Sequence, residues 1–117
     1  MEWYDRFLKR EKWIKKSTEI EGNLYDKLKE ISENELDASI NKIVDACISD
    51  LELGEKIVIY KKANNEINVA RSVIIRESTY KKLEDMREKY GISISKLINI
   101  AIRNGLEKYE KKNFKQD

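Results

Sequence analysis

Two segments of this chain repeat one pattern, in which a strand-like run is followed by two helix-like runs. They occupy residues 17–52 and 72–108. The matching stretches are residues 25–28 (YDKL) with 80–83 (YKKL), and residues 39–44 (SINKIV) with 93–98 (SISKLI). A unit of about 36 residues is too small to bury its own apolar face. The two copies must therefore share one core, and we expect a single domain over residues 1–117.

The net charge of +2 is unevenly distributed along the chain. Residues 17–54 carry three Lys or Arg against ten Asp or Glu, whereas residues 55–117 carry fifteen against nine. A basic surface attracts phosphate backbones and an acidic one repels them. The alternative is that the charged residues, 39% of the chain, simply cover solvated helix faces.

The chain contains no His and one Cys, Cys47. These counts exclude ordinary zinc sites, His-based acid–base catalysis and a disulfide within the chain. We expect Cys47 to be a buried, inert thiol. The sequence contains no Gly-rich phosphate loop and no nucleophile–base pair, so we expect neither an enzyme nor a bound cofactor.

The apolar residues near the start are interrupted by charges every two or three positions. A signal peptide or a transmembrane helix needs a longer apolar run. We therefore expect no membrane association and an intracellular, cytoplasmic location.

Apolar periodicity predicts the helices and strands of the first copy. Residues 13–21 form the strand, and Gly22 and Asn23 break the chain before a helix over residues 24–33. That helix presents Leu24, Leu28 and Ile31 on one face. Asn34 is a candidate left-handed stop residue.

In the second copy, Ser78 or Thr79 can cap the first helix, Gly91 can end it, and Tyr80, Leu83 and Met86 form its stripe. The second helix of each copy opens at Ser39, and at Ser93 or Ser95. Its wide apolar stripe is typical of a helix buried against another helix. The stripe residues are Ile40, Ile43, Val44, Cys47, Ile48 and Leu51 in one copy, and Ile94, Leu97, Ile98, Ala101, Ile102 and Leu106 in the other.

The segment between the copies contains the β-rich run KIVIY at residues 56–60 and a candidate two-residue turn at Asn64 and Asn65. We expect a hairpin here, with residues 66–76 as the strand that leads into the second copy. The expected parts are an N-terminal helix, the first repeat, a connecting β-hairpin, the second repeat and a polar tail that frays, at residues 2–12, 13–53, 54–68, 69–110 and 111–117.

A strand, a helix, a Gly-x-Ser-x-Ser turn and a second helix within about 40 residues resemble the ribbon-helix-helix family of transcription regulators. The second copy carries the resemblance more fully, because Leu36, Asp37 and Ala38 of the first copy replace the Tyr-Gly that precedes the turn. The residues that carry it are Ser72–Ile75, Tyr80, Leu83, Met86, Gly91–Ser95, Leu97, Ile98, Ala101 and Ile102.

Members of that family are homodimers whose two strands pair into an antiparallel ribbon that enters the DNA major groove. Two copies in one chain look like a covalent pseudo-dimer, similar to the tandem regulators of viruses that infect hyperthermophilic archaea. The resemblance implies an α+β, mostly helical fold with two ribbon-helix-helix repeats, plus an extra β-strand and an N-terminal helix. It also implies a DNA-binding transcription regulator that acts in a host cytoplasm on double-stranded DNA. Such a chain needs no symmetric operator, because its halves differ.

The resemblance also places the groove-reading residues on alternate strand positions that face away from the core. Ile20 and Ile75 are then the last core-facing strand residues. The outward residues are Lys15, Ser17 and Glu19 in the first copy, and Ala70, Ser72 and Ile74 in the second. The family holds phosphate with the N-terminal amides of the second helix, which are positively polarised. This role falls on Ser39, Asn41, Lys42, Ser93, Ser95 and Lys96, which can equally be ordinary N-terminal caps.

Several outward residues depart from what a groove favours. Glu19 suits only a cytosine amino group, and Ala70 and Ile74 only a thymine methyl group. An added third strand would bring Ile57 and Ile59 onto the same apolar face.

Three arrangements would resolve the conflict. The hairpin could swing away, the N-terminal helix could cover the sheet with Trp3, Phe7 or Trp13, or the face could bind another protein or a second copy. The alternative function is a protein–protein interaction or antitoxin-like module on the same scaffold.

Overall fold

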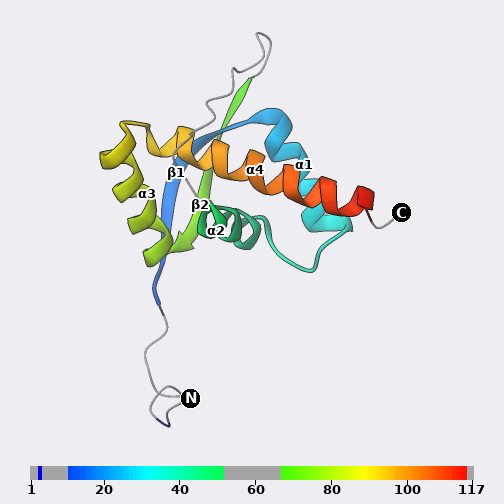
Figure 1. Ribbon diagram of the computed structural model, residues 1–117, viewed down its shortest axis with the longest axis horizontal. Helices are drawn as coiled ribbons and strands as arrows, with labels where there is room; N and C mark the ends of the chain where they lie inside the picture. Colours follow the sequence, from blue (N-terminus) through cyan, green and yellow to red (C-terminus); the bar gives the residue numbers. More distant parts are fainter. Residues whose placement is uncertain (1–2, 4–10, 52–66, 116–117) are drawn as a thin grey trace.

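The pattern of one strand followed by two helices occurs twice in the computed structural model, which describes residues 3, 11–51 and 67–115 (Figure 1). The expected α+β, mostly helical fold is confirmed. The elements are β1 (Trp13–Glu21), α1 (Gly22–Asn34), α2 (Ile40–Asp50), β2 (Asn68–Arg76), α3 (Glu77–Tyr90) and α4 (Ile94–Lys115). The expected N-terminal helix, apart from Trp3, Glu11 and Lys12, and the expected third strand with Ile57 and Ile59 lie outside the described residues.

The two strands pair with each other in an antiparallel, two-stranded sheet. Ser17 pairs with Ser72 at its centre. Ser72 is also the counterpart of Ser17 in the second copy, because Tyr25 and Tyr80 set the offset between the copies. A residue that pairs with its own counterpart marks an approximate twofold axis, which here relates the two strands.

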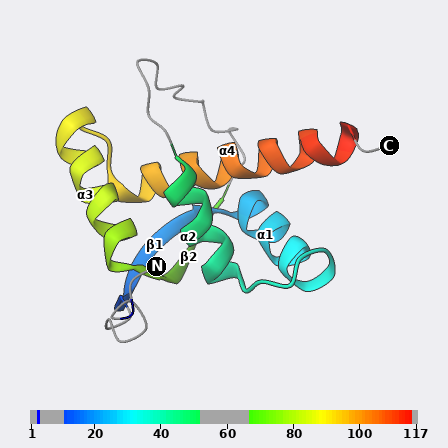
Figure 2. The same ribbon diagram turned by 60° about the horizontal axis from the view of Figure 1, so that its bottom comes forward.

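Successive side chains of each strand point to opposite faces of the sheet. Thr18, Ile20, Val73 and Ile75 are buried on one face. The helices cover that face, with α1 and α3 on opposite sides and α2 between them (Figure 2). Ile20 and Ile75 therefore face the core, as the sequence predicts.

Matched positions of the two copies meet in one core. Leu28 and Leu83, and likewise Val44 and Ile98, are fully buried. Each such side chain contributes about 1.5–3 kcal/mol when it leaves water. The predicted stripes hold in both copies, although Tyr80 and Met86 of α3, and Ile40, Ile43 and Cys47 of α2, are only partly buried.

The serine caps of the two second helices form as expected. The Ser39 hydroxyl accepts a hydrogen bond from the Lys42 amide at 3.3 Å. At the start of α4, the Ser93 hydroxyl accepts one from the Lys96 amide at 3.2 Å, so Ser93 rather than Ser95 is the cap. Gly91 ends α3 in the left-handed conformation, with a φ of 68°.

Three predicted helix ends are wrong. Helix α1 begins at Gly22, whose amide donates to the Ile67 carbonyl at 2.8 Å, so Gly22 and Asn23 belong to the helix. Asn34 is not left-handed, because no non-Gly residue in the described part of the chain has a positive φ. Neither Ser78 nor Thr79 caps α3, which follows Arg76 directly and leaves Thr79 buried.

Helix α4 continues to Lys115, into the segment expected to be a polar tail. Its second half lies beside α1, as Figures 1 and 2 both show. The Tyr109 hydroxyl donates to a Glu35 carboxylate oxygen at 2.9 Å, and Lys27 lies 3.4 Å from Glu110. These contacts join the second half of α4 to the first copy.

Candidate nucleic-acid interface

One face of the two-stranded sheet carries no described helix, and we call it the ribbon face. It is formed by the outward, exposed side chains of Trp13, Lys15, Ser17, Glu19, Asn68, Ala70, Ser72 and Ile74. The opposed pairs are Lys15 with Ile74, Ser17 with Ser72, and Glu19 with Ala70. The outward orientation predicted for all six of these residues is confirmed. Trp13 and Asn68 were missed, although the same alternation extends to them.

The N-termini of α2 and α4 lie against opposite edges of the sheet. At the β2 edge, the Asn41 side-chain oxygen accepts a hydrogen bond from the Ile74 amide at 3.1 Å. At the β1 edge, the Thr18 hydroxyl donates to the Ser95 hydroxyl at 3.0 Å. Asn41 and Ser95 thus fasten the helices to the strands.

The other four predicted phosphate-binding residues are exposed beside the ribbon. Ser39 and Lys42 are on either side of Asn41 in the chain, which bonds to β2, and Ser93 and Lys96 are on either side of Ser95, which bonds to β1. Each serine caps its helix, so the capping role is present at both sites. A lysine and the positive end of a helix dipole therefore lie on each side of the ribbon.

A second pair of polar residues joins each strand end to the helix of the other copy. Both oxygens of the buried Asp45 carboxylate bind Arg76: the backbone amide donates at 2.9 Å and Nε at 2.8 Å. The counterpart of Asp45 is Asn99, whose side chain accepts from the Glu21 amide at 2.9 Å and donates to the Glu19 carbonyl at 2.8 Å. Neither residue was predicted to have this role, although each is a polar residue inside an apolar stripe. They fix the ends of the ribbon relative to α2 and α4.

Two cations stack on the matched tyrosines at the flanks of the ribbon. The Arg71 guanidinium lies 4.7 Å from the ring centre of Tyr25, and the Lys16 ammonium lies 5.7 Å from that of Tyr80. In each pair, the cation belongs to the strand of one copy and the ring to a helix of the other. The match between the two tyrosines is evident from the sequence, but the cations that stack on them were not predicted. Such contacts hold both positive charges beside the sheet.

The end of the ribbon near Trp13 is extended by the residues that precede β1. The Lys12 carbonyl accepts from the Glu77 amide at 3.0 Å, and the Glu11 carboxylate accepts from the Ser78 amide. Hydrogen bonding from Ser78 lowers the pKa of the Glu11 carboxyl below its ordinary value. The negative charge of Glu11 is thereby directed at the start of α3.

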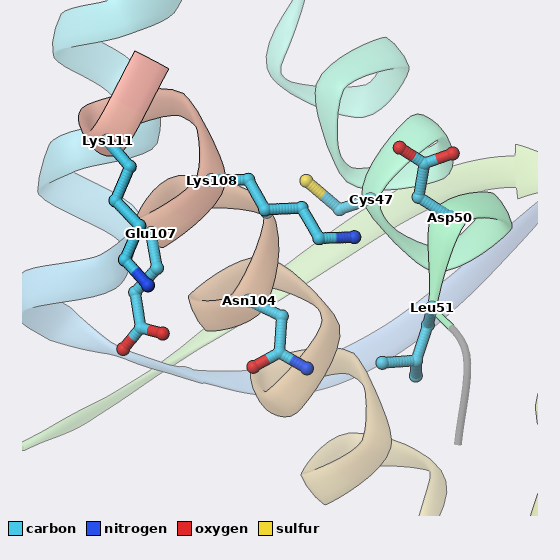
Figure 3. Close-up of a pocket in the computed structure, with 8 residues that line it drawn as sticks. Cys47, Asp50, Leu51, Asn104, Glu107, Lys108 and Lys111 are labelled. Atoms are coloured by element: carbon cyan, nitrogen blue, oxygen red, sulfur yellow. The ribbon is translucent and has the colours of Figure 1, made fainter. Parts of the chain in front are cut away.

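The pocket between α2 and α4 offers no comparable set of binding groups (Figure 3). Cys47 and Asp50 of α2 face Asn104 and Lys108 of α4 across it. Burial raises the pKa of the Cys47 thiol to about 11, with Asp50 adding to the shift, so the thiol is protonated at neutral pH. Cys47 is half-buried rather than buried, and a Cβ at Gly105 would collide with its sulfur.

Residues 3, 11–51 and 67–115 contain no group of three His, Cys, Asp or Glu side chains that could hold a metal ion. Within the same residues, no helix combines the length and the apolar character that crossing a membrane requires. Comparisons with family models, with curated proteins and with solved structures give no significant match to this chain.

Proposed function

We propose that this chain is a DNA-binding transcription regulator of the ribbon-helix-helix type, in which two copies within one chain replace the two subunits of a dimer. The observation that carries the proposal is the pairing of Ser17 with Ser72, its own counterpart. A symmetric dimer pairs the same strand residue with itself at its axis. Here that relation is found within one chain, between two copies that share one core.

The width of the ribbon supports a major-groove fit. Neighbouring strands lie about 4.8 Å apart, whereas the major groove of B-DNA is about 12 Å wide. A two-stranded ribbon therefore enters the groove with room for its side chains. The polar residues at and beside its centre, Lys15, Ser17 and Ser72, can donate hydrogen bonds to base edges.

The positions of the two helix N-termini support contact with the DNA backbone. A groove is bordered by one phosphate strand on each side, and the N-termini of α2 and α4 lie on opposite sides of the ribbon. Lys42 and Lys96 add a positive charge at each site. Both groups attract phosphate, which favours the same docked orientation as the ribbon.

A salt titration of duplex binding tests the proposal. With fluorescence anisotropy of a labelled duplex, we expect the affinity to fall by about 10²-fold between 50 and 200 mM salt if about four phosphates are contacted. The Lys42→Ala and Lys96→Ala variants should each reduce the slope of log K against log salt by about 0.9. Lys15→Ala should also weaken binding.

Lys29→Ala is the matched control, because Lys29 is exposed on α1, away from the ribbon. It should bind as the unaltered chain does. Binding without salt dependence, or an equal loss in the Lys29→Ala variant, would contradict the proposal.

A second candidate function is a protein–protein interaction module on the same scaffold, the antitoxin-like alternative. Its support is the exposure of Trp13 and Ile74 at one end of the ribbon face, at 46% and 38%, together with the acidic Glu19. The ribbon face would then bind a protein or a second copy of this chain. Sedimentation velocity discriminates the two: concentration-dependent dimerisation that Ile74→Asp abolishes and Lys42→Ala leaves unchanged favours this candidate.

A further inference from the structure

We propose that the ribbon face binds a DNA site that is not palindromic, and binds it in one orientation only. This inference depends on the proposed DNA-binding function and specifies the substrate of the same surface. It rests on the chemistry of the side chains on either side of the Ser17–Ser72 pair. That pair is identical in the two copies, whereas the pairs flanking it are not.

One end of the ribbon face is basic and apolar. Lys15 lies opposite Ile74, and Trp13 is the next outward residue of β1. A lysine ammonium donates to the O6 and N7 acceptors of guanine, and an isoleucine side chain contacts the methyl group of thymine. This end therefore favours a half-site that presents guanine acceptors and a thymine methyl group.

The other end is acidic and polar. Glu19 lies opposite Ala70, and the next outward residue of β2 is Asn68. A glutamate accepts a hydrogen bond from the N4 amino group of cytosine, and an asparagine can pair with the N6 and N7 atoms of adenine. This end favours a half-site that presents amino donors.

The two ends cannot be exchanged without penalty. The counterpart of Lys15 is Ala70 and the counterpart of Glu19 is Ile74. Rotation about the twofold axis therefore places each charged side chain where an apolar one had been. In the reversed orientation, Ala70 would face the guanine acceptors and Ile74 the cytosine amino group, and neither can form a hydrogen bond with its side chain. Glu19 would lie where Ile74 had contacted the thymine methyl group. Two mismatched contacts weaken binding by at least about tenfold, which is enough to select one orientation.

The direct test is affinity cleavage from one end of the ribbon. Duplexes selected from a random pool are first sequenced. A metal chelate is then attached to the new thiol of a Lys12→Cys variant that also carries Cys47→Ala. Residue 12 is suitable because its backbone lies beside α3 at the Trp13 end, while its side chain is exposed. We expect cleavage on one side of the site centre only.

Exchange of the four side chains that flank the Ser17–Ser72 pair makes the test sharper. The combined variant is Lys15→Ala, Glu19→Ile, Ala70→Lys and Ile74→Glu. It presents these four central side chains turned by half a turn, so cleavage of the same duplex should move to the opposite side. If that variant does not fold, Lys15→Gln should relax base selection on the side that the chelate cuts and leave the other side unchanged.

The outcomes separate this inference from the proposed function. Salt-dependent binding with cleavage on both sides of the centre, or with a palindromic selected sequence, would overturn the single orientation and leave DNA binding intact. Salt-dependent binding with no enriched sequence would do the same. Absence of any salt-dependent binding would overturn both proposals.

Discussion

The two copies have the same apolar core but fasten their strands differently. In the second copy, the last strand residue, Arg76, is held by the carboxylate of Asp45 through its amide and its guanidinium. In the first copy, the backbone amide of the corresponding Glu21 donates to the neutral side chain of Asn99. The same backbone amide thus has a charged acceptor in the second copy and a neutral one in the first. Both copies supply an acceptor for that amide, which the fold therefore requires, and Asp45 adds a negative charge that pairs with the Arg76 guanidinium.

The largest loss of stability should come from core substitutions, and it should be equal in the two copies. Leu28→Ala and Leu83→Ala each remove a fully buried side chain at matched positions of α1 and α3. We expect each to lower the free energy of unfolding by about 2–5 kcal/mol, because the lost burial is compounded by a cavity. Urea unfolding followed by circular dichroism measures both. A difference of more than about 1 kcal/mol between them would show that the core is not shared equally.

The next largest loss of stability should come from removing the side chains that hold the strand ends, and it should differ between the copies. Asp45→Ala removes an acceptor and also leaves Arg76 without its ion-pair partner, so we expect a loss of about 2–4 kcal/mol. This figure lies below that of a fully buried pair, because the Arg76 side chain is 39% exposed. Asn99→Ala removes neutral hydrogen bonds only, and we expect about 1–2 kcal/mol.

Asp45→Asn is the control for this pair, since it makes the second copy resemble the first. It keeps an acceptor for the Arg76 amide and loses the charge, so its stability should fall between those of the parent chain and the Asp45→Ala variant. Equal losses for Asp45→Ala and Asn99→Ala would mean that the ion pair adds nothing beyond the shared acceptor.

The sequence could predict the features that depend on local pattern. The resemblance to ribbon-helix-helix proteins placed Ile20 and Ile75 toward the core, and this held because strand side chains alternate whatever the surrounding fold. Ser39 was recognisable as a cap, and Ser93 as one of two candidates with Ser95, because a cap bonds to an amide three residues along the same chain.

Contacts between segments that are far apart in the chain could not be predicted from the sequence. Ser78 and Thr79 were poor predictions of a cap, because the first-turn amides of α3 are satisfied by Lys12 and Glu11, from a segment far away in the chain. The partners of Asp45 and Asn99 could not be predicted either, since each lies on a strand of the other copy.

A smaller effect compares the two stacked cations. A double-mutant cycle of Arg71→Gln and Tyr25→Leu should give a coupling energy of about 0.5–1 kcal/mol, typical of a cation over an aromatic face near the surface. The cycle of Lys16→Gln and Tyr80→Leu should give less, because that cation lies 5.7 Å from its ring centre rather than 4.7 Å. Urea unfolding of the parent chain, the four single variants and the two double variants supplies both values. The reverse order would indicate that distance does not set the strength of these contacts.

The smallest change in stability should come from Glu11, which bonds to the start of α3, and it should depend on pH. The Glu11 carboxylate is fully exposed, and its hydrogen bonds with Ser78 lower its pKa below the ordinary value of 4.5. A carboxyl whose pKa is lower in the folded state stabilises the fold above the unfolded pKa, and loses that effect as the pH falls through the folded pKa. Glu11→Gln should therefore reduce stability slightly at pH 7, and the difference from the parent chain should shrink below pH 4.5.

Thermal unfolding of the two proteins at pH 7, 5 and 3 measures this difference. Glu30→Gln is the matched control, because it makes the same change of charge at an exposed position on α1, whereas Glu11 bonds to α3. A difference that grew as the pH fell would require a raised Glu11 pKa, and would mean that Glu11 does not hold the first turn of α3. The Ser78 amide would then need another acceptor. The two strand–helix junctions would be alike only in one bond each, that of the Gly22 amide to the Ile67 carbonyl and that of the Glu77 amide to the Lys12 carbonyl.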